Sequence, residues 1–96
     1  MELKLAFKGD ARRRVFNLLL SLQNQRDSPV IVSLSPVYIR YKNMAVHIEV
    51  SAKHLVLKPA NEPSRSLALL LANTFYRKAD LEAPDIVKAL PESYVL

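Results

Sequence analysis

The chain is 96 residues long, which fits one small domain with a single core, and its formal net charge of +5 favours anionic partners such as nucleic acid or an acidic protein surface. It contains no cysteine, which excludes disulfides, thiolate nucleophiles and thiolate metal sites. It also lacks a signal-peptide pattern and any run of roughly 18 apolar residues, so we expect a soluble, cytoplasmic protein.

The first expected elements are a strand and a helix. Residues 2–8 alternate polar and apolar side chains, which predicts a half-buried strand that ends at Gly9, the only glycine. Asp10 is a suitable N-cap for a helix over residues 11–24. The apolar residues spaced i, i+3, i+4 and i+7 along that helix are Val15, Leu18, Leu19 and Leu22. This stripe predicts a helix that packs one face against the core.

The middle of the chain predicts an antiparallel sheet. The β-branched run 30–34 indicates a buried strand, and the alternating segments 37–42 and 46–50 indicate a hairpin that turns at Asn43. Residues 54–58 form either a further strand or a continuation of the previous one.

A second helix is expected from a cap at Asn61 to about Lys78, and its segment 67–72 is apolar nearly all round. Such a helix must be buried on more than one face. Either residues 84–90 fold over it as a lid, or a partner covers it in a homodimer or a hetero-complex. The residues expected at that subunit interface are Leu69, Leu70 and Phe75.

Together these patterns predict one α+β domain over residues 1–96. An antiparallel sheet is covered on one face by two helices, and a short C-terminal helix precedes a tail at residues 91–96. The tail either packs on its own domain or docks as a strand on a partner's sheet edge.

Catalytic patterns are not found in the sequence. His47 and His54 lie seven residues apart on expected strands, without the spacing of a helical metal site. A single glycine does not suffice for the usual phosphate-cradling loop or nucleophile turn. We therefore expect a non-enzyme with no metal, cofactor or small-molecule substrate.

Two groups of residues are candidates for nucleic-acid binding. Arg12, Arg13 and Arg14 occupy the first turn of the first helix, where free N–H groups and guanidinium groups together favour a phosphate. Tyr38, Arg40 and Lys42 alternate along one strand face, where an aromatic ring and cations suit single-stranded RNA. The alternative is that both groups are solvated surface residues.

The order of elements and the segment Leu55–Asn73 resemble the small dimerisation subunit of the KEOPS tRNA-modification complex. Residues 60–62 correspond to that family's acidic turn, Arg65 and Leu67 to the start of its helix, and Asn73 to its asparagine. The strand near 29–34 and a proline at position 63 depart from the family pattern. The resemblance implies a subunit that dimerises through its helices, binds a kinase-like ATPase subunit and helps to present tRNA for threonylcarbamoyl-adenosine synthesis.

Two functions follow as hypotheses. The first is a small non-catalytic assembly or dimerisation subunit of a larger complex that contributes to tRNA binding or modification. The second is a stand-alone nucleic-acid-binding module that uses the basic helix end and the sheet face. The sequence leaves open whether the partner is RNA, DNA or an acidic protein surface.

Overall fold

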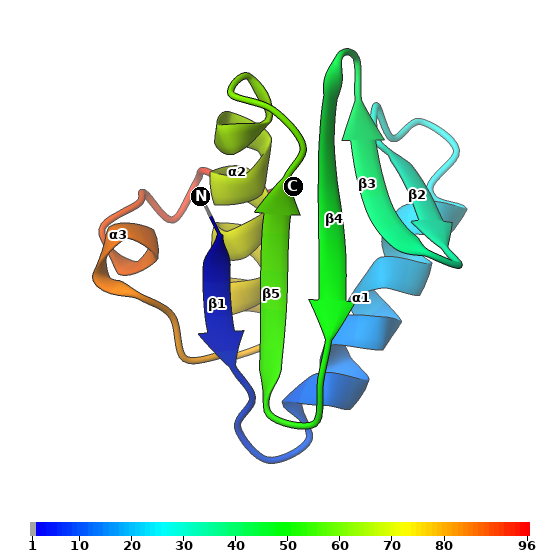
Figure 1. The fold of residues 1–96 in the computed structure, drawn as a ribbon. Coiled ribbons are helices and arrows are strands. Elements are labelled where there is room, and N and C mark those ends of the chain that lie inside the picture. The colour runs from blue at the N-terminus through cyan, green and yellow to red at the C-terminus, as the bar shows by residue number, and fades with distance from the viewer. Residues whose placement is uncertain (1) are drawn as a thin grey trace.

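The computed structural model describes residues 2–96, and its five strands form one antiparallel sheet with α1 and α2 on one face (Figure 1). In chain order the elements are β1 (Leu3–Ala6), α1 (Ala11–Asn24), β2 (Ile31–Leu34), β3 (Val37–Tyr41), β4 (Met44–Val50), β5 (His54–Pro59), α2 (Ser64–Lys78) and α3 (Asp85–Lys88). This confirms the predicted α+β fold with its short C-terminal helix.

The strand order is β1-β5-β4-β3-β2. Strands β2 to β5 pair consecutively, and β1 pairs with β5, so the first strand lies beside the last. His54–Pro59 is therefore a separate strand, which decides between the two alternatives that the sequence leaves open. In the hairpin of β3 and β4, the turn contains Asn43 as predicted, and Lys42 beside it has a positive φ of 54°.

Side chains alternate between the two faces of the sheet, as period-two patterns require. The inward side chains face α1 and α2 and are almost inaccessible to solvent. They include Leu3, Leu5, Val32, Ile39, Val46, Ile48, Leu55 and Leu57. Burial of these side chains against the two helices supplies the main driving force for folding.

The structure confirms α1 within its predicted bounds, and the residues of its apolar stripe are buried or packed against the core. Asp10 stands at the N-cap position, but its carboxylate makes no capping hydrogen bond. The far end of α1 contacts β2, where the Gln23 side-chain amide donates to the Val32 carbonyl at 3.4 Å. One flank of α1 therefore follows the β2 edge of the sheet.

The beginning of α2 is fixed by Asn61 and Ser64. Asn61 Oδ1 accepts a hydrogen bond from the Ser64 N–H at 3.0 Å and another from the Ser64 hydroxyl. The same hydroxyl oxygen accepts the Ala45 N–H at 2.8 Å, which ties the first turn of α2 to β4. Asn61 thus has the capping role expected from the sequence, and fully buried Ser64 extends it to the sheet.

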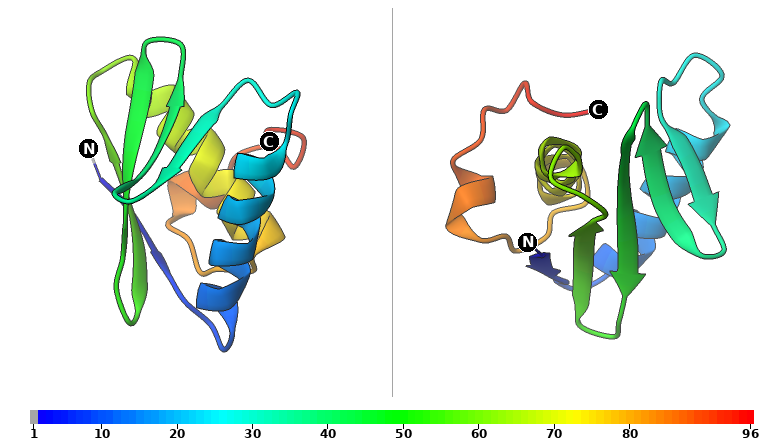
Figure 2. Two further views of the ribbon diagram at one scale, coloured as in Figure 1. Left: turned by 90° about the vertical axis from the view of Figure 1, so that its right-hand side faces the viewer. Right: turned by 45° about the horizontal axis from the view of Figure 1, so that its top comes forward.

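The outer side of α2 is covered by α3 and by residues 90–96, which we call the C-terminal strap (Figure 2, right). Buried Asn73 donates to the carbonyls of Pro91 at 2.9 Å and Tyr94 at 2.7 Å, and the Leu96 N–H donates to Thr74 Oγ1 at 3.0 Å. The chain itself therefore covers the second face of α2, as in the lid alternative. No helix within residues 2–96 combines the length and apolar character needed to span a membrane.

Candidate nucleic-acid interface

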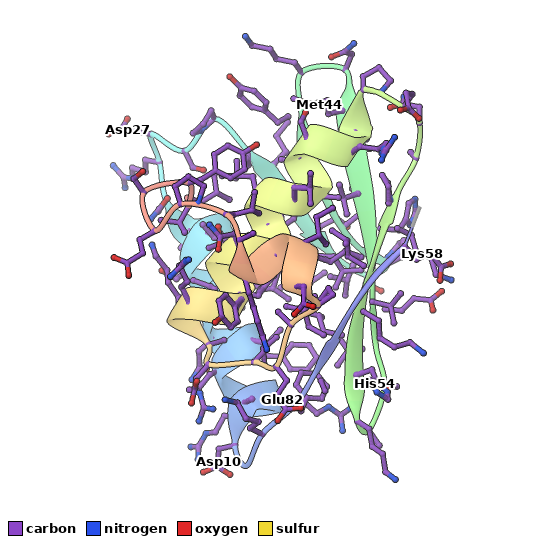
Figure 3. All side chains as sticks on the ribbon, turned by 90° about the vertical axis from the view of Figure 1, so that its left-hand side faces the viewer. Asp10, Asp27, Met44, His54, Lys58 and Glu82 are labelled. Carbon is purple, nitrogen blue, oxygen red and sulfur yellow. The ribbon has the colours of Figure 1, made fainter. Side chains whose placement is uncertain are left out.

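The sheet face opposite the two helices is uncovered, and we call it the open face (Figure 2, left). Strand pairing assigns to it the side chains that alternate with the core residues. They include Lys4, Ile31, Ser33, Tyr38, Arg40, Ala45, His47, Glu49, His54, Val56 and Lys58. Figure 3 shows Lys58 pointing away from the helices on this side. The open face combines aromatic, apolar and charged groups on a rigid support.

Near the middle of the open face, Tyr38 on β3 lies directly opposite His47 on β4. Their ring centroids are 5.9 Å apart and their planes are tilted by 40°. The Tyr38 side chain is half-buried and His47 is exposed, so the pair presents ring surface to solvent. This register brings the two rings together on one face of the sheet, where they form a small aromatic platform.

Arg40 extends this platform toward β2. It is two residues from Tyr38 on the same strand face, and its direct neighbours are Ala45 on β4 and Ile31 on β2. Neither neighbour carries charge, and none of the ion pairs found within residues 2–96 involves Arg40. Its exposed guanidinium is therefore free to meet an anion beside the two rings.

The other half of the open face is internally neutralised. Lys58 Nζ lies 2.9 Å from Glu49 and 3.6 Å from Glu2. The hydrogen bond that Lys58 donates to Glu49, together with the nearby negative charges of Glu49 and Glu2, raises the pKa of Lys58 above its ordinary value of 10.5. Because the Lys58 charge is shared with two carboxylates, Arg40 is the better placed cation for binding phosphate.

Lys42 does not extend the row formed by Tyr38 and Arg40, contrary to the expected alternation. It follows the end of β3, in the hairpin connection, and its ammonium lies 5.3 Å from the centroid of the Tyr41 ring. Tyr41 packs against the core on the helix side of the sheet. The positive φ at Lys42 breaks the strand alternation, which explains the difference.

The three arginines of α1 separate into two kinds. Arg14 donates from Nε to the Ala79 carbonyl at 2.9 Å and from Nη2 to the Lys8 carbonyl at 3.3 Å, so it joins α1 to the end of α2. Arg12 and Arg13 are exposed. Since α1 packs on the covered side of the sheet, the structure does not bring these arginines onto one surface with Tyr38 and Arg40 (Figure 2, left).

The predicted interface residues on α2 also differ in placement. Phe75 is fully buried in the core of the single chain, which corrects its prediction as an interface residue. Leu69 and Leu70 are half-buried, and Leu70 lines an apolar pocket of about 210 Å³ that Leu96 of the C-terminal strap also lines. The apolar sequence of α2 is thus explained mainly by contacts within the chain.

Three residues that the resemblance singles out have local roles. Asn61 caps α2, as described above, and Arg65 pairs with Glu62 at 2.7 Å. Asn73 holds the C-terminal strap and also accepts a bond from Arg77 Nε at 2.9 Å. Sequence analysis missed the Asn73 and Arg77 pair, although an asparagine inside an apolar helix segment, four residues before an arginine, was a usable signal.

Residues 2–96 contain no cluster of three or more histidine or acidic side chains arranged to hold a metal ion. Comparison with family models, curated proteins and solved structures finds no match to this chain. The resemblance to the KEOPS subunit therefore stays a prediction, and the site must be interpreted from its own geometry.

Proposed function

We propose that the protein is a small non-catalytic RNA-binding module whose open face binds single-stranded RNA. The observation that supports this proposal is the aromatic platform of Tyr38 and His47, with Arg40 beside it. Arg40 forms none of the ion pairs found within residues 2–96. Unstacked bases bind to aromatic rings on a sheet, while arginine binds the backbone phosphate or stacks on a base.

The distribution of charge supports the same role. The net charge of +5 attracts a polyanion from any direction. On the open face, the acidic groups Glu2 and Glu49 are engaged by Lys58, which limits their repulsion of phosphate near Arg40. An RNA strand is therefore expected to lie over β3 and β4 and to avoid the half of the face near β5.

The first sequence hypothesis, an assembly subunit that dimerises through α2, has less support from the geometry because α3 and the C-terminal strap cover that helix. A contribution to tRNA binding remains compatible with an open face that takes exposed bases of an RNA loop. In this proposal Arg12 and Arg13 do not contact the same RNA segment as Arg40.

The test is fluorescence anisotropy with a labelled single-stranded RNA of about ten nucleotides, a length within the usual site size of such surfaces. Replacement of Tyr38 by leucine keeps an apolar side chain but removes the ring. Loss of one stacked base costs about 1–3 kcal/mol, so Tyr38→Leu is expected to weaken binding by about 5-fold to 150-fold. Circular dichroism checks that the variant is folded.

A matched pair of charge variants distinguishes RNA binding at the open face from nonspecific electrostatic attraction to the whole protein. Arg40→Gln removes a cation from the open face, whereas Arg26→Gln removes one from the exposed loop after α1. Only Arg40→Gln is expected to weaken binding strongly and to reduce the slope of log affinity against log salt by about 0.7. Absence of binding at low salt, or equal effects of the two variants, would show that the open face is not the RNA site.

A further inference from the structure

The two edges of the sheet differ in protection. At the β1 edge, the Ala6 N–H donates to the Glu82 carbonyl and the Glu82 N–H donates back to Ala6, both at 2.9 Å. At the β2 edge, the Val32 carbonyl points outward, since it accepts the long 3.4 Å bond from Gln23, and β2 has no strand beyond it (Figure 1). One edge is closed by the chain, and the other remains able to pair.

Strand β2 also lacks the features that usually keep an edge unpaired. Its sequence is Ile-Val-Ser-Leu, without a charged residue or a proline, whereas exposed edges are commonly protected by lysine, proline or a bulge. Ile31 is 63% exposed on the open face and is the most exposed large hydrophobic side chain described. A bare, apolar edge of this kind favours pairing with another strand.

The flank of α1 beside β2 carries a second apolar strip. Arg12, Phe16 and Leu20 are spaced four residues apart along this flank, which the Gln23 bond to Val32 places toward the β2 edge. Phe16 is 38% exposed and Leu20 is 45% exposed. Apolar surface therefore borders β2 on both faces of the sheet, through Ile31 on one side and α1 on the other.

We propose that β2 and this flank of α1 form a symmetric homodimer interface, with a second copy of the chain as the occupant. Antiparallel pairing of β2 with its copy requires a two-fold axis perpendicular to the sheet. The same axis sets α1 antiparallel to α1 of the second copy, because the helix lies along the sheet. The same two-fold axis therefore pairs β2 with β2 and packs α1 against α1, so each copy uses the same surface, as in an isologous interface.

Charge complementarity favours a second copy over an unrelated peptide. The first turn of α1 holds Arg12 and Arg13 and no acidic residue, and the last turn holds no basic residue, while Arg26 and Asp27 beyond it cancel in charge. Arginine is unfavourable at the positive N-terminal end of its own helix and favourable near the negative C-terminal end of another. An antiparallel copy of α1 brings these complementary ends toward each other.

Dimerisation would extend the open face. Joining two five-stranded sheets edge to edge gives one continuous sheet, and both Tyr38 and His47 platforms then lie on the same side. This inference does not rest on RNA binding, since the edge, the apolar strip and the helix charges are independent of the open-face platform.

The experiment is light scattering coupled to size-exclusion chromatography over a concentration series of the full chain. The wild type is expected to elute with twice the 10.9 kDa mass of the chain. The double variant Leu20→Lys with Ile31→Lys sets like charges beside each other across the axis and is expected to raise the dimer dissociation constant by about tenfold or more. Both side chains are exposed, so folding should be retained.

The control is Ile86→Lys, which adds the same charge at a 52% exposed isoleucine on α3, away from the β2 edge. It is expected to leave the dimer intact. Amide hydrogen exchange supplies a second readout, because pairing should protect the Val32 N–H in the wild type and not in the double variant. A wild type that stays monomeric at millimolar concentration, or a dimer unchanged in the double variant, would overturn the proposal.

Discussion

Asn73 links α2 to the C-terminal strap, and its replacement by alanine is expected to destabilise the fold strongly. The side chain is fully buried and makes three hydrogen bonds. Its amide donates to Pro91 and Tyr94, and its oxygen accepts from Arg77, at distances of 2.7–2.9 Å. Asn73→Ala removes all three bonds and leaves two carbonyls and one guanidinium without this partner.

The magnitude follows from the number and burial of these bonds. A hydrogen bond contributes about 0.5–1.5 kcal/mol net, and an unpaired buried group costs about 1–3 kcal/mol. Water can reach the exposed parts of the C-terminal strap and offset some of the loss. We therefore expect Asn73→Ala to lower the free energy of unfolding by about 2–4 kcal/mol, a large part of the roughly 5–15 kcal/mol typical of a domain.

The assay is urea unfolding monitored by circular dichroism, with Asn17→Ala as the matched control on the exposed face of α1. The control is expected to change stability by less than about 0.5 kcal/mol. Hydrogen exchange at the Leu96 N–H, which donates to Thr74, reports whether the C-terminal strap has detached. A loss below about 0.5 kcal/mol in Asn73→Ala with unchanged Leu96 protection would refute the assigned role.

Three further outcomes are expected. Deleting residues 91–96 should lower the melting temperature by more than about 5 °C because the C-terminal strap covers α2; an unchanged value in calorimetry would favour a docking tail. Arg14→Gln should cost about 1–2 kcal/mol in urea unfolding, while Arg13→Gln should cost less than about 0.5, because only Arg14 bonds to backbone carbonyls. Because folding raises the pKa of Lys58, its protonated form stabilises the fold below pH 10.5, and this stabilisation is lost as the pH rises through the raised pKa. Glu49→Gln should lower the pKa of Lys58 in an NMR titration.

Regular elements with a clear period were predictable from the sequence. The apolar stripe of α1 and the alternation in β1, β3 and β4 each identify one buried face, and the structure keeps those faces. The alternation fails at Lys42, where a positive φ ends β3 and turns the side chain onto Tyr41. Sequence periodicity predicts which face of a strand or helix a side chain occupies only while the backbone stays regular. Side-chain placement at turns such as Lys42 was therefore not predictable from the alternation.

The cover of α2 was less predictable because it depends on contacts far apart in the chain. The apolar segment 67–72 shows that α2 is buried on several sides, but it does not say whether a partner or the chain itself provides the cover. Asn73 decides this, since its bonds to residues 18 and 21 positions away hold the C-terminal strap in place. Phe75 was assigned to an interface because sequence alone did not show this second layer.

The unfavourable position of three arginines at the N-terminal end of α1 has one explanation for Arg14 and another for Arg12 and Arg13. Arg14 compensates its unfavourable position by bonding to the carbonyl at the end of α2, where a positive charge is favourable. Arg12 and Arg13 have no such acceptor in their own helix end, and Asp10 offers no capping bond there. Their cost is relieved if an antiparallel α1 of a second copy brings a negative helix end to them. Under the two proposals, the basic helix end would serve assembly, while the open face with Arg40 would bind RNA.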